Sequence, residues 1–368
     1  MKRSIVHVCQ PTDGGAAVCV RQLADAGQQA GFDVTVACPS DGPLAGWVEG
    51  SGARWAPLPM VRSPRPRDVR DLARVRRLAA GADVLHLHAS KAGALGRVAR
   101  VGLRRRPRVV FTPHGWSWLV GGSLAPAYRA FERATAPLAD VIVAVSDDDR
   151  EVGLEVLSRA ADRVVVIGNG VDTDRFAPAG PIADRGPEPL LVCVGRLTEA
   201  KGQPLAIEAL ARMGTPDVRL RLVGEGEDEE LLRDLAARAG VAKRVEFAGA
   251  MDDAAPHLRA ADVVVVPSKW DAQSLVLLEA MACGAAILAT RVPGSSAVDG
   301  AGVIAERRDP AEFAAAADAL LADPSHRAQL GAAARERAVD RFAVARSNQR
   351  WVELWTGLAG APNGAAAG

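Results

Sequence analysis

Residues 177–202 read APAGPIADRGPEPLLVCVGRLTEAKG, and this stretch divides the chain in two. Its first half, 177–189, is rich in Pro and Gly and has no hydrophobic period, which is typical of a linker. Its second half begins with a continuous apolar strand, 190–194, and continues into a turn that starts with glycine. Because strands alternate with helical segments on both sides of the linker, we predict two α/β domains rather than one.

Length and composition narrow the class of protein. The chain has 368 residues, too many for one ordinary core, and its 49% hydrophobic and 24% charged residues are typical of a globular protein. The five cysteines are an odd number without CxxC spacing, which favours reduced thiols over disulfides or a zinc site. The sequence has no run of about 18 uncharged apolar residues, and its N-terminus reads as a strand rather than a signal peptide. We therefore expect a cytoplasmic protein.

The predicted strands are continuous runs of Val, Ile and Leu, which predicts parallel sheets covered on both faces. They are 4–9, 33–38, 83–88, 108–112, 141–145 and 163–167 in the first half, and 190–194, 219–223, 244–248, 262–266 and 286–290 in the second. The fold class is therefore α/β, with two Rossmann-like domains at 1–178 and 188–340 facing a central cleft. After them we predict a helix at 341–358 that packs back toward the first domain, and a disordered tail at 359–368.

Ligands of open parallel sheets bind where the strands end. Glycines and charged residues gather in the loops at these ends, including PTDGG at 11–15. There Gly14 and Gly15 precede a helix, so backbone N–H groups can approach a phosphate or a sugar oxygen closely. These loops predict an anionic ligand in the cleft.

The loop GRLTEAKG at 195–202 strengthens that prediction. Arg196 offers a planar fork and Lys201 a point charge, a combination that suits a diphosphate. Gly195 in this loop and Gly224 after the next predicted strand would let backbone come close to the same ligand. The alternative is an exposed pair of loop cations.

The stretch SKWDAQSLVLLEAMACG at 268–284 carries two carboxylates eight residues apart. Asp271 lies in a loop, where it can reach the hydroxyls of a sugar. Glu279 lies inside the predicted helix, placed to accept hydrogen bonds from a ribose diol. The alternative for Glu279 is a partly buried structural acid.

The start of that helix is a predicted phosphate site. Ser274 is the predicted N-cap, and the backbone amides of Leu275 and Val276 form the positive end of the helix. One helix terminus could thus bind a nucleotide-sugar, with an acid for each sugar and amides between them.

The acidic run SDDD at 146–149 has a simpler explanation than metal binding. Ser146 and Asp149 have the spacing of a helix capping box, and acids are favoured in a first helical turn. We predict no metal site.

A basic block lies between residues 62 and 108, where 14 Lys or Arg face three acids. Such a block can contact phosphates or an anionic lipid surface. It lacks the interleaved aromatic residues that stack on bases, so we expect no nucleic-acid partner. A solvated arginine-rich helix face is the alternative.

Several residues near predicted strand ends are candidates for acceptor binding. His88 and Lys91, in HLHASKAG at 86–93, could bind an acceptor phosphate. Trp116 follows His114 and could line an acceptor cleft. Packing and surface roles for these side chains remain open.

With these motifs, the chain resembles the retaining glycosyltransferases of family 4, which have the GT-B architecture of two Rossmann-like domains. The acidic motif of that family, two Glu separated by seven residues, matches Asp271 to Glu279, followed by EAMACG. GRLTEAKG matches its phosphate-binding Arg and Lys, and 166–178 matches its interdomain segment. The pattern in 86–99 and TPHG at 112–115 are similar to bacterial enzymes that build polysaccharide repeats on lipid carriers.

The resemblance implies a role for each domain. The first would bind the acceptor and the second the nucleotide-sugar. Gly14 and Gly15 would form the N-terminal glycine loop, and His114 would lie near C6 of the donor sugar. Arg196 and Lys201 would stabilise the departing diphosphate, and Asp271 would hold the donor hydroxyls.

The resemblance also implies a reaction without metal or cofactor. A hexosyl or N-acetylhexosaminyl unit would pass from a nucleotide-sugar, UDP-linked, to an acceptor hydroxyl with retention, by front-face attack. The acceptor could be lipid-linked, which would place the protein at the inner face of the plasma membrane. Glycan, glycolipid and secondary-metabolite biosynthesis all fit this reaction.

Two departures from the family pattern keep alternatives open. The first motif acid is Asp271 rather than Glu, and Ala272 replaces a flexible glycine. A non-catalytic nucleotide-sugar-binding relative therefore remains open, as does an epimerase or phosphorylase on the same architecture.

Overall fold

The computed structural model describes residues 2–120 and 122–360, and the chain forms two compact units. The N-terminal unit contains residues up to Asn169 and those from Arg346 onward, and the C-terminal unit is Gly170–Ala345. Each unit is built on one parallel sheet. The predicted fold class, α/β with two Rossmann-like domains, is confirmed.

The boundary between the units lies earlier than the sequence predicts. The predicted first domain extends to 178, whereas residues from Gly170 belong to the C-terminal unit. Val171 N donates to Phe342 O at 2.8 Å, and the side chain of Phe176 is buried in the core of that unit. These are long-range contacts, which a local pattern does not reveal.

The predicted linker 177–189 is attached to the C-terminal unit as well. Ala183 N donates to Pro256 O at 2.9 Å, and Arg185 Nη2 lies 2.6 Å from Asp262 Oδ2. The stretch forms no helix or strand, as its composition indicates, but its polar groups are held by the unit that follows it.

The N-terminal unit is built on a seven-stranded parallel sheet in the order β3-β2-β1-β4-β5-β6-β7. Its strands are β1 (Ser4–Cys9), β2 (Asp33–Cys38), β3 (Arg54–Pro57), β4 (Val84–His88), β5 (Arg108–Thr112), β6 (Val141–Ala144) and β7 (Val164–Val166). The sequence predicts all of them except β3. That strand is a short edge strand that ends in proline, so it lacks the apolar run that marks the others.

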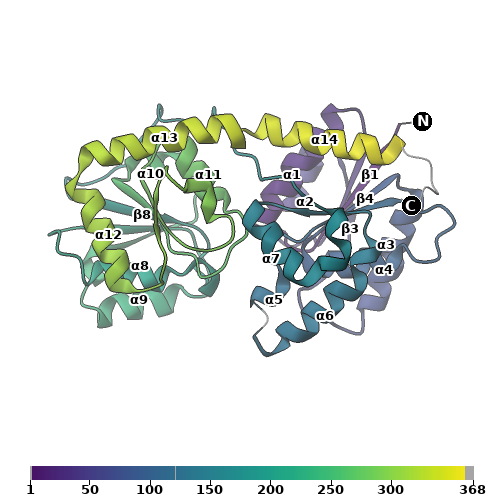
Figure 1. The fold of residues 1–368 in the computed structure, drawn as a ribbon, viewed down its shortest axis with the longest axis horizontal. Coiled ribbons are helices and arrows are strands. Elements are labelled where there is room, and N and C mark those ends of the chain that lie inside the picture. The colour runs from purple at the N-terminus through teal and green to yellow at the C-terminus, as the bar shows by residue number, and fades with distance from the viewer. Residues whose placement is uncertain (1, 121, 361–368) are drawn as a thin grey trace. The chain divides into compact units, whose positions relative to one another are not determined.

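Helices lie on both faces of this sheet (Figure 1). They are α1 (Gly14–Gln29), α2 (Leu44–Ser51), α3 (Asp68–Gly81), α4 (Ala89–Ala99), α5 (Ser117–Val120), α6 (Ala125–Thr135) and α7 (Asp147–Leu157), with 3-10 turns η1 (Gly122–Leu124), η2 (Ala136–Leu138) and η3 (Ser158–Arg163). The central strands β1 and β4 are almost wholly buried under this cover. Polar groups can therefore reach a ligand only from the ends of the strands.

The C-terminal unit has a six-stranded parallel sheet in the order β10-β9-β8-β11-β12-β13. Its strands are β8 (Leu190–Val194), β9 (Arg219–Val223), β10 (Val245–Gly249), β11 (Val263–Val266), β12 (Ile287–Thr290) and β13 (Val303–Ala305). Its helices are α8 (Gln203–Leu210), α9 (Glu229–Arg238), α10 (Ala255–Ala260), α11 (Leu275–Ala282), α12 (Pro310–Ala322) and α13 (Pro324–Phe342), with 3-10 turns η4 (Glu199–Lys201), η5 (Ala242–Arg244) and η6 (Ser295–Val298). The strand order reverses beside β8, where a ligand is expected in such sheets.

The last helix, α14 (Val344–Gly360), packs on the N-terminal unit (Figure 1). Trp351 and Trp355 on α14 are buried in a core shared with β1 and β4. The sequence predicts this helix at 341–358. The observed helix begins three residues later, at Val344, and ends at Gly360, two residues inside the predicted tail. Residues 361–368 of that tail lie outside the described residues.

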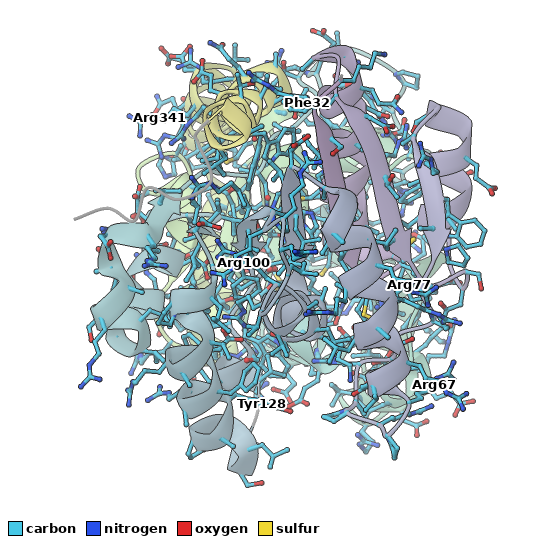
Figure 2. All side chains as sticks on the ribbon, turned by 90° about the vertical axis from the view of Figure 1, so that its right-hand side faces the viewer. Phe32, Arg67, Arg77, Arg100, Tyr128 and Arg341 are labelled. Carbon is cyan, nitrogen blue, oxygen red and sulfur yellow. The ribbon has the colours of Figure 1, made fainter. Side chains whose placement is uncertain are left out.

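The basic block at 62–108 is only partly a surface. Arg97 is fully buried, Lys91 contacts Asp68, and Arg100 and Arg108 both pair with Asp140 at 3.0 and 3.3 Å. The exposed arginines are concentrated on and before α3; Figure 2 shows Arg67 and Arg77 at the edge of the N-terminal unit.

Arg97 forms a deeply buried ion pair in this unit. Its Nη1 lies 2.8 Å from Glu132 Oε2, and both side chains are almost fully buried. Its Nε donates to Gly93 O at 2.9 Å, and the guanidinium lies 4.3 Å from the ring centroid of Phe111. This arrangement joins α4 to α6 and β5, so one arginine of the basic block serves the core.

We predict that Glu132→Leu lowers the free energy of unfolding by about 3–5 kcal/mol, because it leaves the guanidinium buried without its carboxylate. Removing both partners, with Arg97→Met and Glu132→Leu together, should cost much less than the single change. Urea unfolding measures both. Asp33→Asn, which breaks the exposed pair with Arg54, is the control and should cost under about 1 kcal/mol. If Glu132→Leu has a free energy of unfolding equal to or higher than that of the double variant, this reasoning is contradicted.

Candidate functional site

Two loops at neighbouring strand ends form the first part of the site in the C-terminal unit. Gly195, after β8, has φ +146°, and Gly224, after β9, has φ +140°. A Cβ on Gly224 would lie 2.1 Å from Gly195 O, so only glycine allows this approach. Leu197 N donates to Glu225 O at 3.0 Å and holds the two loops together.

The residues predicted to bind the phosphate and the sugar lie beside each other. Lys201 Nζ is 2.6 Å from Asp271 Oδ2, with the two side chains 30% and 18% exposed. Ala272 N donates to Asp271 Oδ1 at 3.0 Å, which fixes the carboxylate further. Arg196 is half exposed, with Nη2 3.5 Å from Glu227 Oε2. Each cation of the loop thus faces a carboxylate that an anionic ligand could replace.

The start of α11 differs in one detail from the prediction. Ser274 occupies the N-cap position, as predicted, although its side chain makes no capping hydrogen bond. The chain enters the helix in an extended conformation, with φ −66° and ψ 124° at Ser274. Leu275 and Val276 form the first turn as predicted, and both are partly exposed.

A small pocket opens at the start of α11, within the C-terminal unit. It is lined by Asp271, Ser274, Leu277, Thr290, Gly294 and Ser295, among others. Gly294 has φ +84°, and a Cβ there would lie 1.7 Å from Ala272 O. The loop after β12 therefore packs directly on the Asp271 loop and closes one side of the pocket.

Arg308 is a residue of this region that the sequence did not reveal. Its Nη1 donates to Pro267 O at 2.5 Å and Ser268 O at 2.6 Å, at the end of β11. Thr290 Oγ1 also donates to Ser268 O, at 2.6 Å. Together they hold the backbone from which the Asp271 loop starts. No motif marks Arg308, because it reaches this backbone from a distant part of the sequence.

Glu279 lies in the second turn of α11 and is partly buried. Burial raises the pKa of its carboxyl to about 7; Arg175 lowers this pKa and Asp253 raises it. The carboxylate makes no hydrogen bond or ion pair with any other residue that the structure describes. A buried acid without a protein partner is typical of a group that meets a ligand.

In the N-terminal unit, the predicted glycine loop begins α1. Gly14 has φ +67° and is the first residue of the helix, and both Gly14 and Gly15 are exposed. His114 follows β5 at φ +52°, a left-handed conformation that is uncommon for a residue with a side chain. Its side chain is half-buried.

The predicted acceptor residues are less accessible than expected. Trp116 is fully buried, stacks on Trp118 at 4.7 Å and donates from Nε1 to Asp149 O at 2.7 Å, so it packs in the core instead of lining an acceptor site. His88 is also fully buried and lies behind His114. Lys91 contacts the carboxylate of Asp68 and remains partly exposed.

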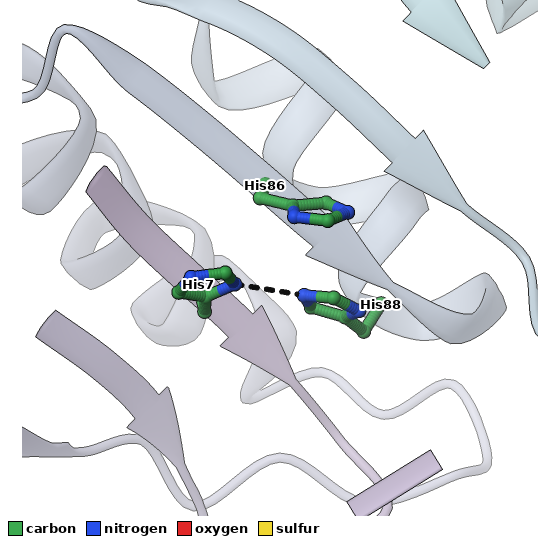
Figure 3. A group of neighbouring side chains, drawn as sticks. All are labelled: His7, His86 and His88. Atoms are coloured by element: carbon green, nitrogen blue, oxygen red, sulfur yellow. Dashed lines mark hydrogen bonds between the residues drawn. The ribbon is translucent and has the colours of Figure 1, made fainter. Parts of the chain in front are cut away.

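Histidines in the middle of the sheet are a feature that the sequence only hinted at. His7 on β1 lies opposite His86 on β4, with His88 two residues further along (Figure 3). His7 Nδ1 is 3.0 Å from His88 Nε2, and His88 Nδ1 is 3.0 Å from His114 Nε2. The signal was histidine inside two apolar runs, one at 4–9 and two at 83–88, whose adjacency only the sheet order shows.

Burial keeps these imidazoles neutral. It lowers the pKa of His7 to about 3 and that of His114 to about 4. Burial, with neighbouring histidines, places the pKa values of His86 and His88 well below the usual range.

The same histidines are the metal-ligand candidates among the described residues. One nitrogen each from His7, His86 and His88 lies within 4.8 Å of the others, and imidazole suits zinc or copper. However, the rings of His86 and His88 pack against each other, with centroids 4.0 Å apart and planes tilted by 37°, and both nitrogens of His88 already face other imidazoles. This geometry favours hydrogen bonding. That the protein needs no metal stays a prediction.

The acidic run at 146–149 forms the predicted helix cap. Asp149 N donates to Ser146 Oγ at 3.0 Å, and Asp149 Oδ2 accepts from Val145 N at 3.2 Å. The side-chain cap predicted for Ser146 at the start of α7 is confirmed, and the return bond of Asp149 described here goes to the amide of Val145, one residue before the N-cap.

No helix within residues 2–120 and 122–360 combines the length and the apolar character needed to cross a bilayer.

Two family models match the chain. The model "Glycosyltransferase Family 4" matches residues 13–175, and "Glycosyl transferases group 1" matches residues 188–323. Together with the two parallel sheets and the polar strand ends, these matches define a glycosyltransferase.

Curated relatives agree with this class. The chain is 33% identical over 290 residues to a GDP-mannose-dependent alpha-(1-6)-phosphatidylinositol monomannoside mannosyltransferase of Mycolicibacterium smegmatis, covering 72% of this chain and 75% of that protein. It is 29% identical over 286 residues to a UDP-Gal:alpha-D-GlcNAc-diphosphoundecaprenol alpha-1,3-galactosyltransferase of Escherichia coli, covering 72% and 73%. The chain belongs to glycosyltransferase family 4.

Solved structures show the same fold. Sucrose-phosphate synthase from Thermosynechococcus elongatus has a TM-score of 0.83 at 23% identity, covering 97% of this chain and 99% of that chain. HepE of Anabaena, in complex with UDP and glucose, has a TM-score of 0.80 at 22% identity, covering 96% and 99%. Both are GT-B enzymes in architecture, as the sequence predicts for this chain.

The raised pKa of Glu279 gives a prediction about stability. The folded protein holds this proton up to about pH 7 and the unfolded chain only to pH 4.5, so stability falls as pH rises between these values. Glu279→Gln should remove that fall. From about pH 5 to about pH 8, the parent should lose about 2–3 kcal/mol more than the variant. Urea unfolding at both pH values measures this, and equal losses would contradict a buried, unpaired carboxyl.

Proposed function

We propose that the chain is a retaining glycosyltransferase that moves a hexosyl or N-acetylhexosaminyl unit from a UDP-sugar to an acceptor hydroxyl. The pair formed by Lys201 and Asp271 carries the proposal. Lys201 lies before α8 and Asp271 before α11, and Nζ of the first is 2.6 Å from Oδ2 of the second. It joins a cation suited to a diphosphate with a carboxylate suited to sugar hydroxyls. The relatives name GDP-mannose and UDP-Gal as donors, and a protein of similar fold holds UDP, which favours the UDP-sugar.

The diphosphate would replace carboxylates as the partner of the cations. It would take Lys201 from Asp271 and Arg196 from Glu227, and the amides of Leu275 and Val276 would add further donors. Asp271 would then be free to accept from the donor hydroxyls. Charge that develops on the leaving diphosphate would be stabilised by groups already in place.

Glu279 would accept hydrogen bonds from the ribose diol. Such donors favour the ionised form of a carboxyl and would lower its pKa from about 7. A hydroxyl pair would thus supply the partner that the carboxylate lacks among the described residues.

The chemistry needs no protein nucleophile. His114 would contact the donor sugar, and the leaving phosphate would accept the proton of the attacking hydroxyl. Neither a metal nor a cofactor takes part in this proposal. Exclusion of water would matter, because hydrolysis competes with transfer.

The acceptor would be lipid-linked, as part of glycan or glycolipid synthesis. The relatives named above act on a phosphatidylinositol monomannoside and on a diphosphoundecaprenol. The exposed arginines around α3, Arg67, Arg70, Arg74 and Arg77, could contact an anionic lipid surface at the inner face of the plasma membrane.

We predict that Lys201→Ala weakens UDP binding about tenfold to hundredfold, the loss of one charge-assisted contact. Asp271→Asn removes the carboxylate that competes for Lys201, so this variant should bind UDP at least as tightly as the parent does. It should nevertheless lose hydrolysis and transfer of the UDP-sugar. Calorimetry with UDP and GDP measures binding, and a panel of UDP- and GDP-sugars measures turnover.

Lys269→Ala is the matched control, because Lys269 contacts Glu199 in the neighbouring loop rather than Asp271. It should change neither quantity. If neither nucleotide binds the parent, the phosphate site is refuted. If a nucleotide binds but no sugar of the panel is hydrolysed or transferred, the chain is a non-catalytic relative. Sugar epimerisation without acceptor, or sugar release that depends on phosphate, would show an epimerase or a phosphorylase.

Membrane contact has a separate test. Arg67→Glu with Arg77→Glu should weaken binding to vesicles containing anionic phospholipid by about 1 kcal/mol or more per residue. Arg341→Glu, an exposed arginine on α13, is the charge control. Vesicle flotation that is the same for both variants and the parent would argue against this surface.

A further inference from the structure

Three histidines stand in the middle of the N-terminal sheet, and the proposed reaction leaves them unused. His7, His86 and His88 are fully buried, with 0% accessible surface each. Their neighbours in β1 and β4 are almost all apolar. A polar side chain at such a place needs hydrogen-bond partners, because an unpaired one is costly to bury.

Three imidazoles form a chain that ends at His114. His7 Nδ1 faces His88 Nε2 at 3.0 Å, and His88 Nδ1 faces His114 Nε2 at 3.0 Å. The links therefore run in one sense, from Nδ1 of one ring to Nε2 of the next. His7 and His88 are fully buried, whereas His114 is half-buried at the end of β5. The chain connects the core with the edge where ligands bind.

The links restrict where the protons can be. A neutral imidazole has one donor nitrogen and one acceptor nitrogen. When the three rings are neutral and both links are hydrogen bonds, all three carry the proton on Nδ1 or all three carry it on Nε2. The outer nitrogen of His114, Nδ1, is then a fixed donor or a fixed acceptor. A histidine alone in water would exchange between the two.

Other contacts hold the rings of this cluster in position. Trp355 on α14 packs against His7 at 5.6 Å between centroids, and Trp351 packs against His86 at 4.8 Å. His86 itself bonds Thr112 Oγ1 through Nε2 at 2.9 Å and takes no part in the chain. The C-terminal helix thus covers the buried end of the chain.

We propose that His7 and His88 are positioning residues for His114, which hold its ring in one orientation and one tautomer. The Nδ1 atom of His114 then offers a single hydrogen-bonding role to a hydroxyl of the donor sugar. The contact with the sugar rests on the proposed function, whereas the ordered chain is a property of the N-terminal unit alone. His88 acts through His114 and does not touch the substrate.

The low pKa values support this role. Protonation of His114 would turn both of its nitrogens into donors, and burial holds its pKa near 4. The ring therefore stays neutral over the physiological range, and the chain stays ordered.

Nitrogen-15 NMR of the histidine rings in the full-length protein tests the chain directly. Pyrrole-type and pyridine-type nitrogens have distinct shifts, so each tautomer can be assigned. We expect His7, His88 and His114 to share one tautomer without averaging. In His88→Leu, the shifts of His114 should move toward the average of the two forms. A parent His114 that is already averaged, or a His114 unaffected by His88→Leu, would overturn the proposal.

Matched variants separate positioning from stability. His86→Leu removes a histidine of equal burial from the same strand and should leave the tautomer of His114 unchanged. His88→Asn keeps an amide group that can bond His114 Nε2, so it should hold the ring of His114 in place and show less averaging of its two tautomers than His88→Leu does. It also guards against His88→Leu failing to fold. If His86→Leu disturbs His114 as much as His88→Leu does, the effect is general loosening of the core and the proposal is wrong.

Turnover of the UDP-sugar then links the chain to function. His88→Leu should lower kcat at least about tenfold, the effect of a misplaced contact, with UDP affinity unchanged. His88→Asn should recover most of kcat. If NMR shows the ordered chain but no sugar is transferred, the proposed function fails and the chain stands. If transfer is normal and His88→Leu leaves kcat unchanged, the positioning role fails and the proposed function stands.

Discussion

Burial of both sheet faces is the constraint on which this structure depends. Each unit has a parallel sheet with helices on both faces, so the strands are apolar and their backbone groups are used within the sheet. Charged and polar side chains can then meet a ligand only at strand ends. Lys201 follows β8, Asp271 follows β11 and His114 follows β5, in agreement with this constraint.

The histidines of β1 and β4 are the exceptions, and the same constraint explains how they are arranged. A polar ring inside a covered sheet must find its partners nearby. His7 lies opposite His86 because β1 and β4 are neighbours in register, and His88 falls on the same face two residues later. His88 faces His114, which lies just after β5. The pairing of buried nitrogens therefore continues to the end of the strands, where ligands bind.

In the C-terminal unit, charge compensation distinguishes the groups of the site. Lys201 and Arg196 each face a carboxylate, whereas the partly buried Glu279 has no cation bonded to it among the described residues. Burial without a partner raises the pKa of Glu279 to about 7. Paired cations and an unpaired buried acid suit a ligand that carries both a diphosphate and free hydroxyls.

Local sequence signals identified most of the framework. Continuous apolar runs predicted the strands except β3 and β13, which are short edge strands without a long apolar run. The spacing of Ser146 and Asp149 predicted a helix cap that is present. The same kind of reasoning could not tell that Trp116 and Arg97 are buried, because an aromatic ring or a guanidinium looks alike in sequence whether it faces solvent or the core.

By itself, the sequence determined two parallel α/β domains, the strand ends where polar groups gather, and membership of a family through its motifs. Only the tertiary structure decided which of these groups meet. Lys201 pairs with Asp271, 70 residues away, and His7 pairs with His88, 81 residues away. The physical reason is that hydrophobic period and capping act over a few neighbouring residues, whereas these partners are chosen by the order and register of the strands.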